Sequence, residues 1–218
     1  MKKVAIIGAN GQIAHLVEER LLAETDVELT LLLRNSNRLA NLADNPRVRI
    51  IDGDAKNLED LKKAIQGQDL VYVSFVDHGA GATLTKNVIR LMDEAGVKRL
   101  ISSNILGIYD EVPGEFGRYN REVCFGGKVT EDNPAVVSDR EIENSDLDYT
   151  VMRIAWLNDH PDTNYTVTYK GEEYIGVSVS RKSVADVVVR IVKDFDLFNK
   201  ESIGFADPAT QGATRPVY

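Results

Sequence analysis

The chain has 218 residues, a length at which one α/β domain can bury a full hydrophobic core without disulfides. Its 28% of charged and 43% of hydrophobic residues are typical of an ordinary globular protein, and no apolar run approaches the ~18 residues of a membrane helix. The net charge of −8 argues against a nucleic-acid-binding surface, and the single cysteine, Cys124, excludes an internal disulfide and is consistent with a cytoplasmic location.

Strand-like and helix-like segments alternate through the first half of the chain. Short β-branched or apolar runs predict strands at Val4–Ile7, Val27–Leu33, Val48–Ile51, Leu70–Phe75 and Arg99–Ser103. Apolar residues at helical spacing predict helices between them, at Gln12–Ala23, Leu58–Ile65 and Thr83–Ala95. This alternation with short connections predicts an α/β fold with a doubly wound, parallel Rossmann sheet.

The pattern changes after Tyr109. Residues 110–134 contain prolines and several glycines with little periodicity, which predicts a long, lid-like loop. Beyond it we expect a helix near Ala135–Asn144, strands at Tyr149–Ala155 and Tyr165–Tyr169, and a helix at Val184–Phe195. Residues 1–218 should therefore form one nucleotide-binding domain, in which residues 155–183 make a small C-terminal substrate lobe.

A glycine-rich turn joins the first strand to the first helix. Gly8 can make the tight turn, and Gly11 can let the backbone approach a pyrophosphate at the N-terminus of the helix. A glycine turn can also merely shorten a loop, but here a strand precedes it and a helix follows it, as dinucleotide binding requires. We therefore expect the cofactor to contact the turn and the start of the helix, at Gly8, Asn10, Gly11, Gln12 and Ile13.

The end of the second strand indicates which dinucleotide binds. Proteins specific for NAD place a carboxylate there, whereas this chain has Arg34 and Arg38 and no acidic residue between Glu28 and Asp44. A guanidinium can bind a 2′-phosphate with two hydrogen bonds, so NADP(H) is favoured, although both arginines could be ordinary surface residues. Further contacts with the cofactor are expected from the ends of the third, fourth and fifth strands, at Asp54, Ala55, Ser74, Phe75, Val76 and Ser102.

Several motifs along the chain belong together: Gly8-Ala9-Asn10-Gly11-Gln12, Arg34, Gly53-Asp54, Ser102-Ser103, Ser145-Asp146-Leu147-Asp148-Tyr149-Thr150-Val151-Met152-Arg153 and Val179-Ser180-Arg181-Lys182-Ser183-Val184-Ala185-Asp186. With these motifs the sequence resembles the atypical short-chain dehydrogenases, in particular their NAD(P)H-binding, NmrA-like and flavin-reductase-like members. The resemblance extends over nearly the whole chain and implies a Rossmann fold with bound NADP(H). Members of this group reduce flavins, quinones or tetrapyrroles, or sense the cofactor without turning it over.

The Tyr-x-x-x-Lys pair of typical short-chain dehydrogenases is not found. Tyr109 is followed four residues later by Pro113 and Tyr119 by Val123, and alignment with the family helix places Ala135 at the lysine position. In that pair the lysine lowers the pKa of the tyrosine so that it can donate a proton. The remaining catalytic candidates are Ser102 and Ser103, whose hydroxyls could bind a substrate carbonyl or could simply end a strand.

A planar acceptor such as a flavin or quinone depends less on a protein acid, and the hydride chemistry belongs to the cofactor. Candidate residues of its pocket are His78, Tyr109, Tyr119 and Trp156, with Phe116 and Phe125 completing an aromatic wall. His78 could equally be a solvated loop residue, and the aromatic residues could be packing of the loop on the core. Cys124 has no histidine near it in sequence, and no group of residues has metal-ligand spacing.

Two classes of function remain open. The first is an NADPH-dependent reductase of a small planar acceptor, acting as a cytoplasmic monomer or homodimer without nucleic-acid or membrane partners. The second is a regulatory protein that senses NADP(H). An isomerase or epimerase acting on nucleotide sugars is less favoured, because such enzymes generally depend on the Tyr–Lys pair.

Overall fold

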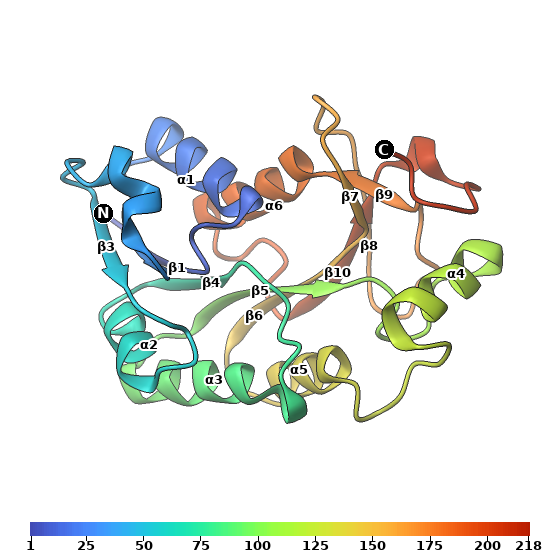
Figure 1. Ribbon diagram of the computed structural model, residues 1–218, viewed down its shortest axis with the longest axis horizontal. Coiled ribbons are helices and arrows are strands. Elements are labelled where there is room, and N and C mark those ends of the chain that lie inside the picture. The colour runs from blue at the N-terminus through green and yellow to red at the C-terminus, as the bar shows by residue number, and fades with distance from the viewer.

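A sheet of eight strands forms the middle layer of the protein in the computed structural model, which describes residues 1–218 (Figure 1). Its strands pair in parallel except at one edge, where β8 is antiparallel to β10. The doubly wound Rossmann sheet predicted above is thus confirmed, with one antiparallel edge strand added. In spatial order the strands are β3 (Val48–Asp52), β2 (Glu28–Leu33), β1 (Lys3–Ile7), β4 (Leu70–Val73), β5 (Arg99–Ile105), β6 (Asp148–Ile154), β10 (Glu201–Ala206) and β8 (Thr166–Thr168).

Helices cover both faces of the sheet. On one face lie α1 (Gln12–Glu24) and α6 (Arg181–Lys193), and on the other α2 (Leu58–Ile65), α3 (Thr83–Ala95) and α5 (Pro134–Glu143) (Figure 1). None of the helices is long and apolar enough to cross a membrane. Because β2 and β4 are buried on both faces, these two strands are apolar almost throughout, as their sequences indicate.

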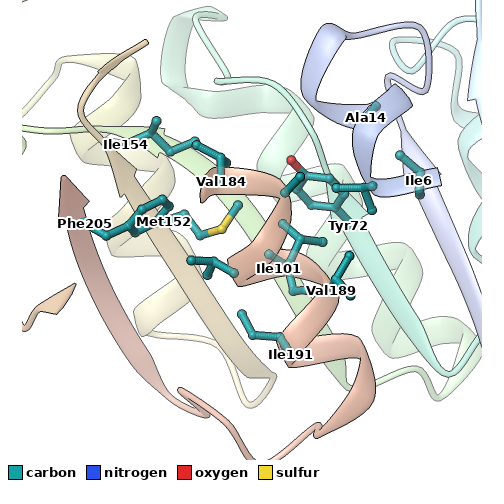
Figure 2. Close-up of a cluster of buried hydrophobic side chains, with 14 of the residues drawn as sticks. Ile6, Ala14, Tyr72, Ile101, Met152, Ile154, Val184, Val189, Ile191 and Phe205 are labelled. Atoms are coloured by element: carbon teal, nitrogen blue, oxygen red, sulfur yellow. The ribbon is translucent and has the colours of Figure 1, made fainter. Parts of the chain in front are cut away.

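Successive side chains of a strand point to opposite faces of the sheet, and the core is accordingly divided into two clusters, one on each face. Ile6 belongs to the larger cluster, on the α1 and α6 side, and its neighbour Ile7 to the smaller one, on the α2 and α3 side. Figure 2 shows part of the larger cluster, where Met152 of β6 lies beside Val184 of α6. Burying each such aliphatic side chain contributes about 1.5–3 kcal/mol, so the two clusters hold the layers together.

Local sequence signals fix most of the helix ends. The Asn57 side chain accepts hydrogen bonds from two backbone N–H groups in the first turn of α2, and Gly96 ends α3 with a left-handed φ of +68°. Helix α6 begins three residues earlier than expected, because the Ser180 hydroxyl caps it by accepting from the Ser183 N–H at 3.0 Å.

The segment 110–134 differs from the loop predicted for it, because it contains helix α4 (Gly114–Phe125). Its glycines do not mark irregular chain. Gly126 ends the helix in the left-handed region, and Gly117 allows close packing, since a Cβ there would lie 2.0 Å from the Val112 carbonyl oxygen. Before α4, the buried carboxylate of Glu111 accepts hydrogen bonds from two backbone N–H groups and pairs with Arg153 at 2.7 Å. This stretch of chain is therefore anchored to the core.

The region expected to form a small C-terminal lobe is distributed over two sheets. Strand β7 (Trp156–Asn158) pairs with β9 (Ser178–Ser180) in a separate two-stranded sheet, whereas β8 extends the central sheet. Strand β10, which the sequence reading did not predict, lies between β6 and β8 and connects this region to the core. Three short 3₁₀ helices complete the chain: η1 (Ser36–Leu42), η2 (Ala80–Ala82) and η3 (Pro208–Thr210).

Candidate functional site

A cavity of about 660 Å³ lies at the carboxyl ends of β1, β2, β3 and β4. The connection after β1 leads to a helix on one face of the sheet, and those after β3 and β4 to helices on the other face (Figure 1). Doubly wound sheets bind their ligands at such a switch point. The cavity is lined by Gly8, Leu32, Leu33, Arg34, Gly53, Asp54, Ala55, Lys56, Phe75, Val76, Asp77, His78, Gly79, Thr83, Leu84 and Asn87.

The turn after β1 is built around Gly8. Its φ of +87° favours glycine, and a Cβ there would lie 2.5 Å from the Phe75 ring. The N–H groups of Gly8 and Ala9 both donate to the Leu32 carbonyl, at 3.0 and 3.1 Å, and the Ser74 hydroxyl is 2.8 Å from the Gly8 carbonyl oxygen. Neighbouring strands on both sides thus hold the turn, so the fold itself requires glycine at position 8.

At Gly11, in contrast, the fold does not require glycine. Its φ of −72° suits any residue, and a Cβ would meet only the Gly8 carbonyl oxygen at 3.5 Å and atoms farther away. Gly11 stands at the N-terminus of α1, which no side chain caps and whose first turn holds no acidic residue. The first N–H groups of a helix need acceptors and favour a negative charge. A phosphate is suited to this position, and a side chain on residue 11 would obstruct its approach.

Cationic side chains form part of the cavity wall. Arg34, directly after β2, is exposed, and its guanidinium is engaged by no ion pair or hydrogen bond within the chain. Lys56, which sequence reasoning missed, lines the same cavity from the loop after β3 and also lacks an acidic partner. One Asp54 carboxylate oxygen accepts from the Lys56 N–H at 2.9 Å, which leaves the other oxygen for a ligand. The wall thus holds two cationic side chains that make no ion pair, together with the carboxylates of Asp54 and Asp77, and the two cations can bind an anionic group.

The structure brings together some of the residues expected to bind the cofactor. The cavity wall includes Gly8, Arg34, Asp54, Ala55, Phe75, Val76 and, from the expected substrate pocket, His78. Outside the wall lie Asn10, Gly11, Gln12 and Ile13, which continue from Gly8 into α1, together with Ser74 beneath the turn and Arg38 in η1.

Ser102 and Ser103 are both almost fully buried and do not line this cavity. Ser102 faces a void of about 10 Å³ among side chains of α3 and α5, whereas the Ser103 hydroxyl lies 3.4 Å from the hydroxyl of Tyr72. Burial raises the pKa of Tyr72 to about 12. Both hydroxyls are thus enclosed by neighbouring side chains.

The aromatic residues expected to face a substrate lie elsewhere. Tyr109 lines a second cavity of about 590 Å³, where its hydroxyl is 2.7 Å from an Asp139 oxygen and 3.0 Å from a Glu143 oxygen. Burial, reinforced by Asp139, raises the pKa of Tyr109 above its ordinary value. Tyr119 packs on Trp156 with ring centroids 5.5 Å apart, and His78 belongs to the first cavity. These residues do not form one pocket.

The cavity residues that sequence reasoning missed lie mainly near the carboxyl ends of strands and in the loops that follow them. Asp77, after β4, accepts hydrogen bonds from the Gly79 N–H at 2.9 Å and from the Thr85 N–H and hydroxyl at 2.9 and 3.0 Å. This ties the loop that lines the cavity to α3. Their position in the sequence could have indicated them, because residues that directly follow parallel strands meet at one edge of the sheet.

Comparisons with known proteins agree with this geometry. A family described as NAD(P)H-binding matches residues 8–195. A Rossmann-fold NAD(P)-binding family protein from Shigella flexneri is 33% identical, with a TM-score of 0.81 and coverage of 100% of this chain and 99% of the other. A short-chain dehydrogenase/reductase from Veillonella parvula DSM 2008, in complex with NADP, is 26% identical with a TM-score of 0.88 and the same coverage.

The anaerobilin reductase ChuY from Escherichia coli O157:H7 shares the fold at 22% identity, with a TM-score of 0.76 and coverage of 99% of this chain and 100% of that one. At this identity the likeness concerns the fold alone. No match was found among curated protein sequences.

Proposed function

Because the chain belongs to the NAD(P)H-binding family, we propose that it is an NADP(H)-dependent oxidoreductase that reduces a planar acceptor such as a flavin or quinone. The observation that carries the cofactor preference is Arg34, a guanidinium without an acidic partner in the cavity wall. NAD-specific folds place a carboxylate at the end of this strand, whereas arginine suits a 2′-phosphate. The similar Veillonella protein, crystallised with NADP, supports the same preference.

The residues around the cavity fit such a cofactor. The uncapped N-terminus of α1 beside Gly11 would receive the pyrophosphate, and Arg34 the 2′-phosphate. Asp54 and Ala55, on the loop after β3, would contact the adenine. When bound, NADPH supplies a hydride, so the contribution of the protein is to place an acceptor and exclude water.

The preference for a planar acceptor follows from the proton donors. Tyr109 is engaged by Asp139, and its raised pKa makes it a poorer acid than a free tyrosine. Ser103 is buried against Tyr72, away from the cavity. General acid catalysis typically contributes ~10²–10⁴-fold to carbonyl reduction, and neither group is arranged to provide it. A flavin or quinone can distribute the incoming charge over its rings and take a proton from water.

Cofactor titration tests the first half of the proposal. NADPH should bind at least about tenfold more tightly than NADH, which corresponds to about 1.4 kcal/mol. Arg34→Ala should remove this preference, whereas Arg38→Ala, which changes an exposed arginine outside the cavity wall, should retain most of it. Equal affinities in the unmodified protein, or a preference that survives Arg34→Ala, would contradict the assignment.

Oxidation of NADPH against flavins, quinones and aldehydes tests the second half. We expect slow turnover with at least one planar acceptor and little with simple aldehydes. Robust aldehyde reduction would mean that an unrecognised acid acts in the site. Tight binding of NADPH without turnover of any planar acceptor would favour the alternative function, a protein that senses NADP(H).

A further inference from the structure

An acidic residue at the end of β3 holds the turn that follows Arg34. One Asp52 carboxylate oxygen accepts from the Asn35 N–H at 3.0 Å, and the other from the N–H and hydroxyl of Ser36 at 3.2 and 3.0 Å. Asn35 is left-handed, with φ +64° and ψ +78°, a region that few residues other than glycine adopt but in which asparagine is enriched. Three hydrogen bonds from a residue sixteen or seventeen positions away thus fix this turn.

This contact joins the two loops that form one end of the cavity. Asp52 pairs in register with Leu33, and the Gly53 N–H donates to the Leu33 carbonyl at 3.0 Å. Arg34 directly follows β2, and the chain after β3 leads to Lys56. Both cations of the cavity wall therefore come from loops that are joined at this point. Asp52 itself does not line the cavity, and both its oxygens are used by the turn.

We propose that Asp52 is a positioning residue for NADP(H) preference, because it fixes the Asn35–Ser36 turn and thereby directs the Arg34 guanidinium to the cavity. The inference rests on the proposed preference for NADP(H). Without the three hydrogen bonds, the turn samples other conformations, and the apparent affinity falls with the fraction of molecules in which Arg34 is in place. Cofactor without a 2′-phosphate does not need Arg34 and is unaffected.

The charge of Asp52 acts in the opposite direction to its positioning role. Its carboxylate is negative and lies near the region proposed for the 2′-phosphate, so its removal could strengthen binding by relieving repulsion. However, the side chain is exposed and its charge already faces the N–H groups of the turn, which weakens its field at a distance. We therefore expect the loss of positioning to be the larger effect.

The test compares dissociation constants for NADPH and NADH, and for 2′-AMP and 5′-AMP, by calorimetric or fluorescence titration. Asp52→Asn keeps the size of the side chain but cannot accept all three hydrogen bonds, and it should raise the dissociation constant of NADPH about fivefold while that of NADH stays within about twofold. Asp52→Glu, which keeps the carboxylate, should restore part of the affinity. Asp44→Asn is the control, since it removes an exposed charge just beyond η1 that makes no hydrogen bond to the turn.

A double-mutant cycle separates positioning from a general structural effect. If Asp52 acts through Arg34, Asp52→Asn should cause no further loss of NADPH affinity in the Arg34→Ala background. Unchanged or tighter NADPH binding by Asp52→Asn would overturn the inference, as would an additive loss in the double variant. An unmodified protein without preference for NADPH would instead refute the proposed function, whatever Asp52 does.

Discussion

Replacing the two glycines of the turn after β1 should separate folding from cofactor binding. Gly8→Ala adds a Cβ at a φ of +87°, only 2.5 Å from the Phe75 ring and 2.9 Å from the Ser74 hydroxyl. Backbone strain and the displaced ring together should lower the free energy of unfolding by about 1–3 kcal/mol or more. Loss of NADPH binding by this variant alone would therefore not identify a binding site.

At Gly11 the same kind of change should leave the fold intact. The nearest atom to a Cβ there is the Gly8 carbonyl oxygen at 3.5 Å, an ordinary contact. The weaker N-capping of alanine, about 0.5–1 kcal/mol, is offset by about 0.4–1 kcal/mol from the reduced freedom of the unfolded chain. Gly11→Ala and Gly11→Val should thus unfold within about 1 kcal/mol of the unmodified protein, with valine slightly less stable.

Binding should respond strongly to the same substitutions. If the side chain separates a phosphate from about two N–H groups at the start of α1, the loss of about 1.5 kcal/mol for each charged hydrogen bond weakens NADPH binding about 100-fold. Urea unfolding gives the stability of each variant, and fluorescence titration gives its affinity. A Gly11→Val protein that is fully folded and binds NADPH within twofold of the unmodified chain would refute the reasoning.

Two further predictions concern buried charge. Burial raises the pKa of Glu18 to about 8 from 4.5, and neither of its oxygens is hydrogen-bonded. Because the folded pKa of Glu18 is the higher one, its contribution to stability is fully present below pH 4.5 and is lost as the pH rises towards 8. Over this range the free energy of unfolding of Glu18→Gln, measured with urea, should increase by up to about 4 kcal/mol relative to that of the unmodified protein. A difference between the two proteins that does not change with pH would contradict this. Glu111→Ala removes the partner of the fully buried Arg153 and should lower the free energy of unfolding in urea by about 3–5 kcal/mol. Glu115→Ala, which breaks an exposed pair with Arg215, is the control and should lower it by about 1 kcal/mol at most. Similar losses in the two variants would refute this.

Much of the fold can be predicted from short stretches of sequence. Apolar runs of about five residues and helical repeats identify strands β1 to β5 and helices α1 to α3, and the turn from Gly8 to Ala14 predicts a dinucleotide at the first crossover. These signals are local, because a strand buried on both faces must be apolar along its length and a tight turn requires glycine. Arg34 could be found in the same way, since it directly follows an identifiable strand.

The tertiary structure decided the features that depend on residues far apart in the chain. The segment 110–134 contains a helix and is anchored before it, because Glu111 pairs with Arg153, forty-two residues later. The Tyr109 hydroxyl donates a hydrogen bond to Asp139, thirty residues away, and Asp52 reaches back to Ser36. The burial of Ser102 and Ser103 likewise depends on the helices that pack over β5. Periodicity shows which residues share a face of their own element, but the partner that each meets is set by how the layers pack, because a hydrogen bond or ion pair requires two groups to be brought together in space.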